Sequence, residues 1–399
     1  MKEKQEKYAR LLLKCLKLEE KKYLFVRIPD FLSDFTELIQ RAAEEYDLKE
    51  VHIEVEEVIK KHDLLKNLDQ ENINKHPMFD HKEYNRYAKL DAAFLFIQSM
   101  VPNLMDDIDP KKIKDTATHT RETEKDFRSL YETNKLNWCI AGVPNEYWAR
   151  DGLKMTLEEL WELIFKVCLI DDENDPYELW QEKLDNLDKK TKVLNDYNFK
   201  YLKYSNSLGT DLRVYLPEGH IWACGKDKLG RIVNLPTEEI FTSPLYNKTE
   251  GIVYSSKPLL YNNVLIEDFS LEFKEGKVVN MQAKKGEEVL KGIIETDEYS
   301  CYLGECALVS FDSPISNTNI IFKETLYDEN ASCHLALGSG FNECVKDSKD
   351  LRGDDLRNLG VNDAKTHVDF MIGTEDLKIV GVTRDGEEIT IMKEGNLAI

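Results

Sequence analysis

The sequence lacks the cysteine pairs and the basic charge that mark two large classes of protein. None of its eight cysteines forms a Cys-x-x-Cys pair, which argues against a structural zinc site and favours free, mostly buried thiols. Acidic residues outnumber basic ones by 75 to 54 and leave a net charge of −21. Because nucleic acids and anionic membrane surfaces reward basic patches, we expect neither as a partner.

No stretch of the chain has the length and apolar character of a membrane span. The longest candidate, AAFLFIQSMVPNLM, is too short and contains Pro102. The opening segment MKEKQEKYAR is charged and does not resemble a secretory signal. We therefore expect a cytoplasmic protein with no membrane partner.

Several familiar catalytic motifs are also absent. The chain contains no GxSxG elbow, no P-loop, no GxGxxG fingerprint and no HExxH motif. The short GSG at 338–340 carries little weight alone. Any catalytic chemistry must therefore come from the histidines and carboxylates that are scattered through the second half.

Residues 1–204 predict an α/β domain. The segments YARLLLKCLKL and FTELIQRAAEEYD have the spacing of amphipathic helices, and KYLFVRIP and KEVHIEVEE predict strands. This strand–helix–strand order favours a parallel sheet. Farther on, NWCIAGVP predicts another strand, and the segments at 156–170 and 175–197 predict long polar helices.

Residues 205–399 predict a second, mainly β domain with a few helices, of the α+β class. Short β-like runs alternate there with Gly, Asn and Asp turns. LEFKEGKVVNM and LKIVGVTRDGEEITIM each predict a hairpin, with Glu275-Gly276 and Asp385-Gly386 at the turns. With 399 residues, 42% of them hydrophobic, the chain is large enough for two cores.

The eight histidines are unevenly distributed. Five lie in the first 120 residues, in polar surroundings that predict surface positions: 52, 62, 76, 81 and 119. His220 follows a Pro-Glu-Gly turn, and we interpret it as structural. His334 and His367 remain, and each alone would more often be a satisfied core or turn residue than a ligand.

Two features nevertheless favour His334 and His367 as ligands. In HVDFM at 367–371, alternation predicts a strand with His367 and Asp369 on one side and apolar residues on the core side. An aspartate on an otherwise buried strand is costly unless it is paired or bound to a metal. Three other carboxylates stand in comparable apolar settings: Glu239 in NLPTEEIFTSP, Glu305 in YLGECALVSF, and Glu329.

Four ordered segments resemble a known family. NLPTEEIFTSP, LGECALVSFDSPIS, DENASCHLALGSGF and HVDFMIG are similar to the successive motifs of the thermophilic-type metallo-aminopeptidases, the family of aminopeptidase T and aminopeptidase S. The resemblance covers the whole chain, including YARLLL and GTDLRVYLPEGHIW. It implies a homodimeric hydrolase with a two-metal site in the C-terminal domain, acting on peptides with a free N-terminus. The implied ligands are Glu239, Glu305, His334, His367 and Asp369, with Glu329 as a sixth ligand or an outer base.

The chemistry of this ligand set is coherent. Carboxylates mixed with imidazoles suit Zn²⁺, Co²⁺ or Mn²⁺ better than Ca²⁺, and Mg²⁺ is a further option. Two such ions, roughly 3.5–4 Å apart, can activate a shared water and polarise the scissile carbonyl. Four carboxylates balance two divalent ions, and the hydroxide leaves about one excess negative charge that favours a free α-ammonium group. Glu305 is either the bridging carboxylate or the proton carrier.

One position departs from the family pattern. The family has tyrosine seven residues after the histidine of the ENASCH motif, and this chain has Phe341. Losing a hydroxyl that donates to the oxyanion costs roughly 10²–10³-fold in turnover, unless Tyr302 or Tyr327 replaces it. We predict an aminopeptidase. Two alternatives stay open: a metal-bound but catalytically weak peptide-binding homologue, and a protein with paired carboxylates and no metal.

Overall fold

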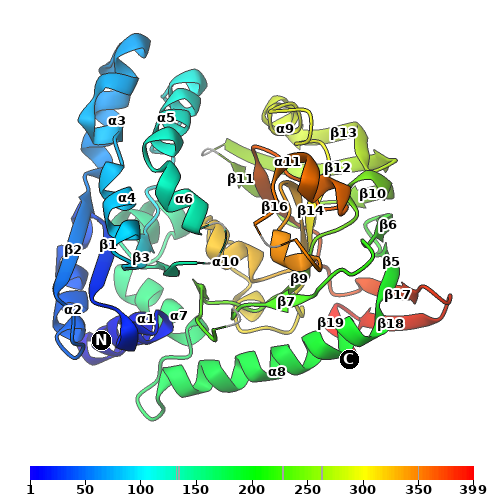
Figure 1. Cartoon of the computed structure of the whole chain (residues 1–399), viewed down its shortest axis with the longest axis horizontal. Helices are drawn as coiled ribbons and strands as arrows, with labels where there is room; N and C mark the ends of the chain where they lie inside the picture. Colours follow the sequence, from blue (N-terminus) through cyan, green and yellow to red (C-terminus); the bar gives the residue numbers. More distant parts are fainter. Residues whose placement is uncertain (132, 134, 227–228, 262–263, 349) are drawn as a thin grey trace. The chain divides into compact units, whose positions relative to one another are not determined.

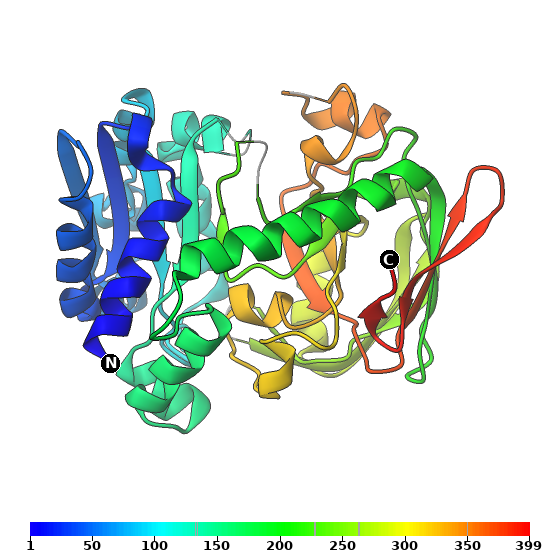
Figure 2. The same ribbon diagram turned by 90° about the horizontal axis from the view of Figure 1, so that it is seen from below.

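The chain divides into two compact units in the computed structural model (Figures 1 and 2). One unit contains residues 1–181 and 226–236, and the other contains residues 182–225 and 237–399. This division by compactness does not test the domain boundary between residues 204 and 205, which stays a prediction. The structure describes residues 1–131, 133, 135–226, 229–261, 264–348 and 350–399.

The first unit is built on a five-stranded sheet in which every strand pair is parallel. In this order β2 and β3 lie on opposite sides of β1. The strands added after β2 therefore extend the sheet from the other edge of β1. The last strand, β8, comes from much later in the chain, and no sequence pattern predicts it. The strands in spatial order are β2 (Glu50–Glu56), β1 (Tyr23–Pro29), β3 (Ala93–Gln98), β4 (Asn137–Gly142) and β8 (Asn234–Leu235).

Helices cover both faces of this sheet (Figures 1 and 2). On one face, α1 (Lys2–Cys15), α2 (Ser33–Ala43) and α7 (Leu157–Val167) meet through the rings of Tyr8, Phe35 and Trp161. On the other face, α4 (Lys82–Lys89) and α6 (Lys125–Tyr131) enclose an aromatic core that contains Phe25, Tyr84, Tyr87, Phe94 and Phe127. Further helices of this unit are α3 (Val58–Asn67) and α5 (Pro110–Thr123), and α8 (Pro176–Tyr197) begins here and continues into the second unit.

Local sequence signals explain several of these helices. Thr156 and Glu159 form a reciprocal capping box at the start of α7. Asp109 caps α5, whose first residue is Pro110. The predicted helices and strands of the first half are confirmed as α1, α2, α7, α8, β1, β2 and β4.

The second unit contains two antiparallel sheets. The larger has the order β11-β12-β10-β6-β5-β17-β18-β19, with β13 paired to β12, and the smaller has the order β16-β15-β14-β9-β7. The larger sheet consists of β5 (Phe199–Ser205), β6 (Asp211–Tyr215), β10 (Glu250–Tyr254), β11 (Leu259–Tyr261), β12 (Val264–Lys274), β13 (Lys277–Lys285), β17 (Lys378–Thr383), β18 (Glu388–Lys393) and β19 (Asn396–Leu397). The smaller consists of β7 (Ala223–Cys224), β9 (Ile240–Thr242), β14 (Leu303–Leu308), β15 (His334–Gly338) and β16 (His367–Met371). Helices α9 (Glu287–Ile294), α10 (Thr325–Glu329) and α11 (Gly353–Asn358) accompany them, together with most of α8.

Both predicted hairpins are confirmed. Strands β12 and β13 pair down to Lys274 and Lys277, and the two turn residues between them, Glu275 and Gly276, have φ values of 50° and 79°. A two-residue type I′ turn requires this left-handed conformation at both positions. Strands β17 and β18 form the second hairpin. The mixed α/β content and the several sheets agree with the predicted fold class.

Two expectations about the whole chain can also be compared with the structure. All eight cysteines are buried and none of them forms a disulfide, in agreement with the prediction. Within the described ranges, no helix combines the length and apolar character that crossing a membrane requires.

Candidate metal centre

The six predicted ligands all lie in the second unit, five of them on or beside the small sheet. Glu305 lies within β14, His334 begins β15, and β16 carries His367 and Asp369. Glu239 immediately precedes β9, which pairs with β14. The sixth, Glu329, is the last residue of α10.

The register of the small sheet explains how these side chains meet. Glu305 pairs with Ala336 of β15, and Ala336 pairs with Asp369 of β16. Residues opposite one another on neighbouring strands share a face, so the two carboxylates flank one buried methyl group. The small Ala336 side chain leaves space between them. On the other face, Val368 and Phe370 are buried, as the alternating pattern predicts.

Two groups of three donor atoms form on this face, and Glu305 belongs to both. Glu239, Glu305 and His334 make the first triad, and Glu305, His367 and Asp369 make the second, with ligand atoms within 4.8 Å of one another in each. His334 Nε2 lies 3.2 Å from Glu239 Oε2. His367 Nε2 lies 3.2 Å from Glu305 Oε2 and 3.4 Å from Asp369 Oδ1.

Both imidazoles are oriented through their Nδ1 atoms. His334 Nδ1 lies 3.1 Å from the carbonyl oxygen of Ser332, and His367 Nδ1 lies 2.7 Å from that of Ser339. Because a carbonyl oxygen only accepts, each Nδ1 carries the hydrogen and donates it. With Nδ1 carrying the hydrogen, a ring that binds a metal does so through its Nε2 lone pair, which faces the carboxylate-lined space. Metal-ligating histidines are held in this way by a backbone carbonyl or a carboxylate.

The carboxylates are crowded and poorly solvated. Burial raises the pKa of Glu305 to about 7 against an opposing hydrogen bond from His367, and the Asp369 and Glu239 carboxylates raise it further. Burial likewise raises the pKa of Glu329 well above its usual range, again with Asp369 and Glu239 contributing. Anions placed this close together in a dry site require a compensating positive charge.

The two histidines supply part of that charge. Burial alone would lower the pKa of His334 and of His367, yet both are raised well above the usual value, chiefly by Glu239 at His334 and by Asp369 at His367. Asp369 Oδ1 is buried, and its 3.4 Å contact with His367 Nε2 falls short of a hydrogen bond. Four carboxylates around two imidazoles, with an orphaned oxygen among them, form a donor set that fits divalent metal ions.

Asn330 joins two of the ligand segments. Its fully buried side chain accepts the backbone N–H of Glu238 through Oδ1 at 2.7 Å and donates through Nδ2 to Leu326 O at 2.9 Å and to Glu329 Oε1 at 3.5 Å. Because Glu238 directly precedes Glu239, one amide links the backbone at one predicted ligand to the helix end that carries another. Our sequence reasoning missed this residue, and its place inside the ENASCH motif is the signal that marks it.

Phe341 lies beside the second triad. Its ring centroid is 5.1 Å from that of His367 and 5.2 Å from that of Phe241. The substituted position is therefore close enough to the triads for the missing hydroxyl to matter. The two candidate replacement tyrosines contact other aromatic rings: Tyr302 meets Tyr246 edge-on and Tyr299 at a tilt, and Tyr327 stacks on Phe322.

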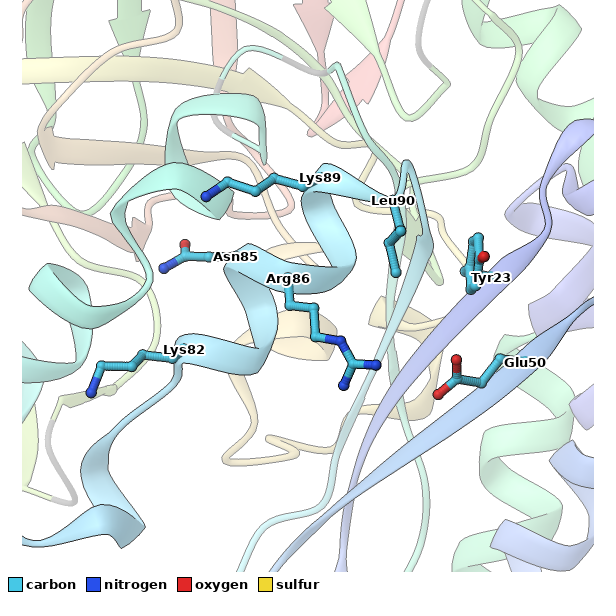
Figure 3. Close-up of a pocket in the computed structure, with 7 residues that line it drawn as sticks. All are labelled: Tyr23, Glu50, Lys82, Asn85, Arg86, Lys89 and Leu90. Carbon is cyan, nitrogen blue, oxygen red and sulfur yellow. The ribbon is translucent and has the colours of Figure 1, made fainter.

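The other histidines discussed above and a surface pocket of the first unit do not belong to the triads. His220 is buried, with Nδ1 3.1 Å from Pro217 O, and belongs to neither triad. His62 and His81, predicted on the surface, are instead largely covered, with 12% and 15% of their side chains exposed; His81 stacks on Tyr84. A pocket in the first unit lies at the amino ends of β1 and β2 (Figure 3). It is lined by Tyr23, Glu50, Lys82, Asn85, Arg86, Lys89 and Leu90.

Comparisons with known proteins identify the family of the chain. Residues 1–397 match the family described as thermophilic metalloprotease (M29). Aminopeptidase AmpS of Bacillus subtilis (strain 168) is 37% identical over 405 residues, covering 98% of this chain and 97% of that protein. Aminopeptidase T of Thermus thermophilus is 34% identical over 339 residues, covering 83% and 82% of the two chains.

A solved structure extends the comparison to the fold. Wild-type AmpT from Thermus thermophilus matches with a TM-score of 0.88 and 31% sequence identity, covering 100% of both chains. The chain therefore belongs to the thermophilic metalloprotease family M29, and it is a metal-dependent peptidase.

Proposed function

We propose that this protein is an aminopeptidase that removes N-terminal residues from peptides with the help of two divalent metal ions. The observation that carries the proposal is the pair of donor triads that share Glu305. Relatives named aminopeptidases, at 34% and 37% identity, support the choice of reaction. The comparisons offer no support for the alternative of a catalytically weak peptide-binding homologue.

Each triad would hold one ion. Glu239 and His334 would bind the first, His367 and Asp369 the second, and Glu305 would bridge them because its carboxylate belongs to both groups. The bound ions would supply Lewis-acid activation of a water and of the scissile carbonyl. The carbonyl oxygens behind the two imidazoles keep the Nε2 atoms aimed into the site.

Glu329 would carry the proton. It stands at the end of α10, outside both triads, yet close enough to Asp369 and Glu239 for their charges to raise its pKa. With Glu305 assigned to the bridge, the Glu329 carboxylate would take a proton from the attacking water and deliver it to the departing amine.

The excess of carboxylates also accounts for the preference for a free N-terminus. Four carboxylates around two imidazoles present negative charge to an incoming peptide, and an α-ammonium group is attracted there while an acetylated N-terminus is not. The remaining expectations, namely a site in the C-terminal domain (205–399), a homodimer and a cytoplasmic location, rest on the family resemblance. Light scattering tests the dimer directly.

The deciding experiment combines metal counting with cleavage. The full chain is stripped with a chelator, reloaded separately with Zn²⁺, Co²⁺, Mn²⁺ or Mg²⁺, and assayed for release of N-terminal residues from free and N-acetylated peptides. We expect two ions per chain and cleavage of the free peptides alone. One ion at saturation, or equal cleavage of acetylated peptides, would contradict the proposal.

Phe341 provides a separate arm of the same experiment. If the chain binds two ions but cleaves slowly, Phe341→Tyr restores the missing hydroxyl beside His367 and should raise turnover by roughly 10²-fold or more. Phe241→Tyr, on the partner ring 5.2 Å away, serves as the matched control for an added hydroxyl. An unchanged rate in Phe341→Tyr would remove this position from the explanation.

A further inference from the structure

The parallel sheet of the first unit has a topological switch point at β1. Strand β2 pairs with one side of β1 and β3 with the other, and all three run in the same direction. Open α/β sheets bind ligands at the carboxyl ends of the strands that flank such a point, because the crossover connections leave in opposite directions there. A ligand-binding site separate from the metal centre is therefore expected among the residues at this end of β1 and β3.

Arg27 occupies that position. It lies in the carboxyl half of β1, pairs in register with Phe96 of β3, and holds its guanidinium 5.5 Å from the centroid of the Phe96 ring. Its Nε atom is buried and makes no hydrogen bond, and the carboxylate of Glu56 stands 3.9 Å away. A guanidinium presents five N–H donors in a planar fork, so Arg27 retains donors for an oxyanion.

A second unsatisfied donor lies next to it. The hydroxyl of Tyr84 is buried without a hydrogen bond, and it is close enough to Arg27 to contribute to the raised pKa of the guanidinium. Burial alone would lower that pKa, but Glu56, Tyr84 and Glu124 together outweigh it. The Tyr84 ring stacks on His81, with centroids 4.9 Å apart and planes 9° apart, so the hydroxyl is held in place.

Charged side chains of both signs surround these two donors. Lys61 Nζ on α3 lies 2.9 Å from Glu56 Oε1, and Arg128 on α6 lies 2.7 Å from Glu124 Oε1. Arg27, Lys61 and Arg128 thus stand among three carboxylates, Glu56, Glu124 and Glu54, so the charges balance before any protonation of His81, which lies 3.0 Å from Glu124. In a chain with a net charge of −21, a half-buried cluster whose charges balance is a local exception.

We propose that this group binds a small oxyanion, a carboxylate or a phosphate, at the carboxyl end of β1. We call it the Arg27 cluster; it consists of Arg27, Glu56, Lys61, Tyr84, Glu124 and Arg128. The Arg27 guanidinium and the Tyr84 hydroxyl donate to the anion, and the Phe96 ring supports the flat face of the guanidinium. Lys61 and Arg128 are already paired, so they contribute charge rather than new hydrogen bonds.

Equilibrium titration of the metal-loaded full chain tests the proposal. The probes are inorganic phosphate, acetylglycine and acetylglycine amide, which separate phosphate, carboxylate and uncharged ligands. We expect saturable binding of phosphate or acetylglycine but not of the amide, and at least tenfold weaker binding in Arg27→Gln. The proposal would be overturned if the parent chain showed no saturable binding, or if Arg27→Gln bound the anion with the affinity of the parent chain. The second result is also the one expected if the anion binds at the metal centre.

Arg86→Gln is the matched control. Arg86 differs from Arg27 in being exposed and already paired: it lies on α4, and its guanidinium is 2.9 Å from the Glu83 carboxylate. It lines the pocket at the amino ends of β1 and β2 (Figure 3). Its replacement should leave anion affinity unchanged, and a loss there alone would move the site to that pocket. If Arg27→Gln fails to fold, Lys61→Gln takes its place, with a severalfold loss of affinity expected and an unchanged affinity counting against the Arg27 cluster.

Discussion

Replacing Asn330 with alanine should loosen the metal centre without removing any ligand. The substitution deletes the acceptor for the Glu238 N–H and the donor to Leu326 O, which lie 2.7 Å and 2.9 Å from the amide. Both partners belong to buried residues, so water does not readily replace the amide. Each buried group left unpaired costs about 1–3 kcal/mol, which gives a destabilisation of about 2–6 kcal/mol for the pair.

The loss of these hydrogen bonds should disturb the position of Glu239, because the N–H that loses its acceptor belongs to the preceding residue, Glu238. We expect metal affinity to fall about 10–100-fold, the usual effect of removing a group that orients a ligand. The assay is competition with a chelator of known affinity, combined with hydrogen exchange of the peptide that spans Glu238. Exchange there should accelerate in Asn330→Ala.

A matched control separates orientation from general damage. Asn145 in the first unit is also buried, accepts from Trp148 N and donates to Ser99 Oγ and Met100 O. Asn145→Ala should lower stability to a similar extent while leaving metal affinity unchanged. If Asn330→Ala binds metal as tightly as the parent chain, or if Asn145→Ala loses affinity equally, the positioning role of Asn330 is refuted.

Three further predictions concern single positions. His367→Ala and Asp369→Asn should each remove one ion per chain and abolish metal-dependent cleavage while circular dichroism stays that of the parent; normal turnover in either would refute their assignment as ligands. Ala336→Val should fill the space between the two flanking carboxylates and weaken metal binding at a cost of about 1–3 kcal/mol in stability, whereas Ala336→Ser should be tolerated. Burial raises the pKa of Glu56, but Arg27 and Lys61 outweigh burial and lower this pKa from 4.5 to about 2. The ionised Glu56 carboxylate therefore contributes stability above pH 4.5, and this contribution is lost as the pH falls toward 2. Urea unfolding between pH 7 and pH 3 should therefore show a smaller acid loss in Glu56→Gln, and equal losses would contradict the stated cause.

Much of the local structure follows from the sequence, because it depends on neighbouring residues. Alternation in HVDFM predicted a strand with Val368 and Phe370 in the core, and the Glu275-Gly276 pair predicted a hairpin; both are confirmed. The four ordered motifs identified the family, and the match over residues 1–397 confirms it. The roles of the individual ligands stay predictions.

Tertiary structure decided which distant groups meet. Strand β8 joins the parallel sheet from residues 234–235, and the register across three strands places Ala336 between two carboxylates. Asn330 reaches the backbone of Glu238, 92 positions away. A sequence pattern records the period of side chains along one element, whereas these contacts depend on the register and packing between elements. For that reason a candidate ligand set could be proposed from the ordered motifs of the chain, while Asn330 and the Arg27 cluster in the other unit could be seen only in the folded structure.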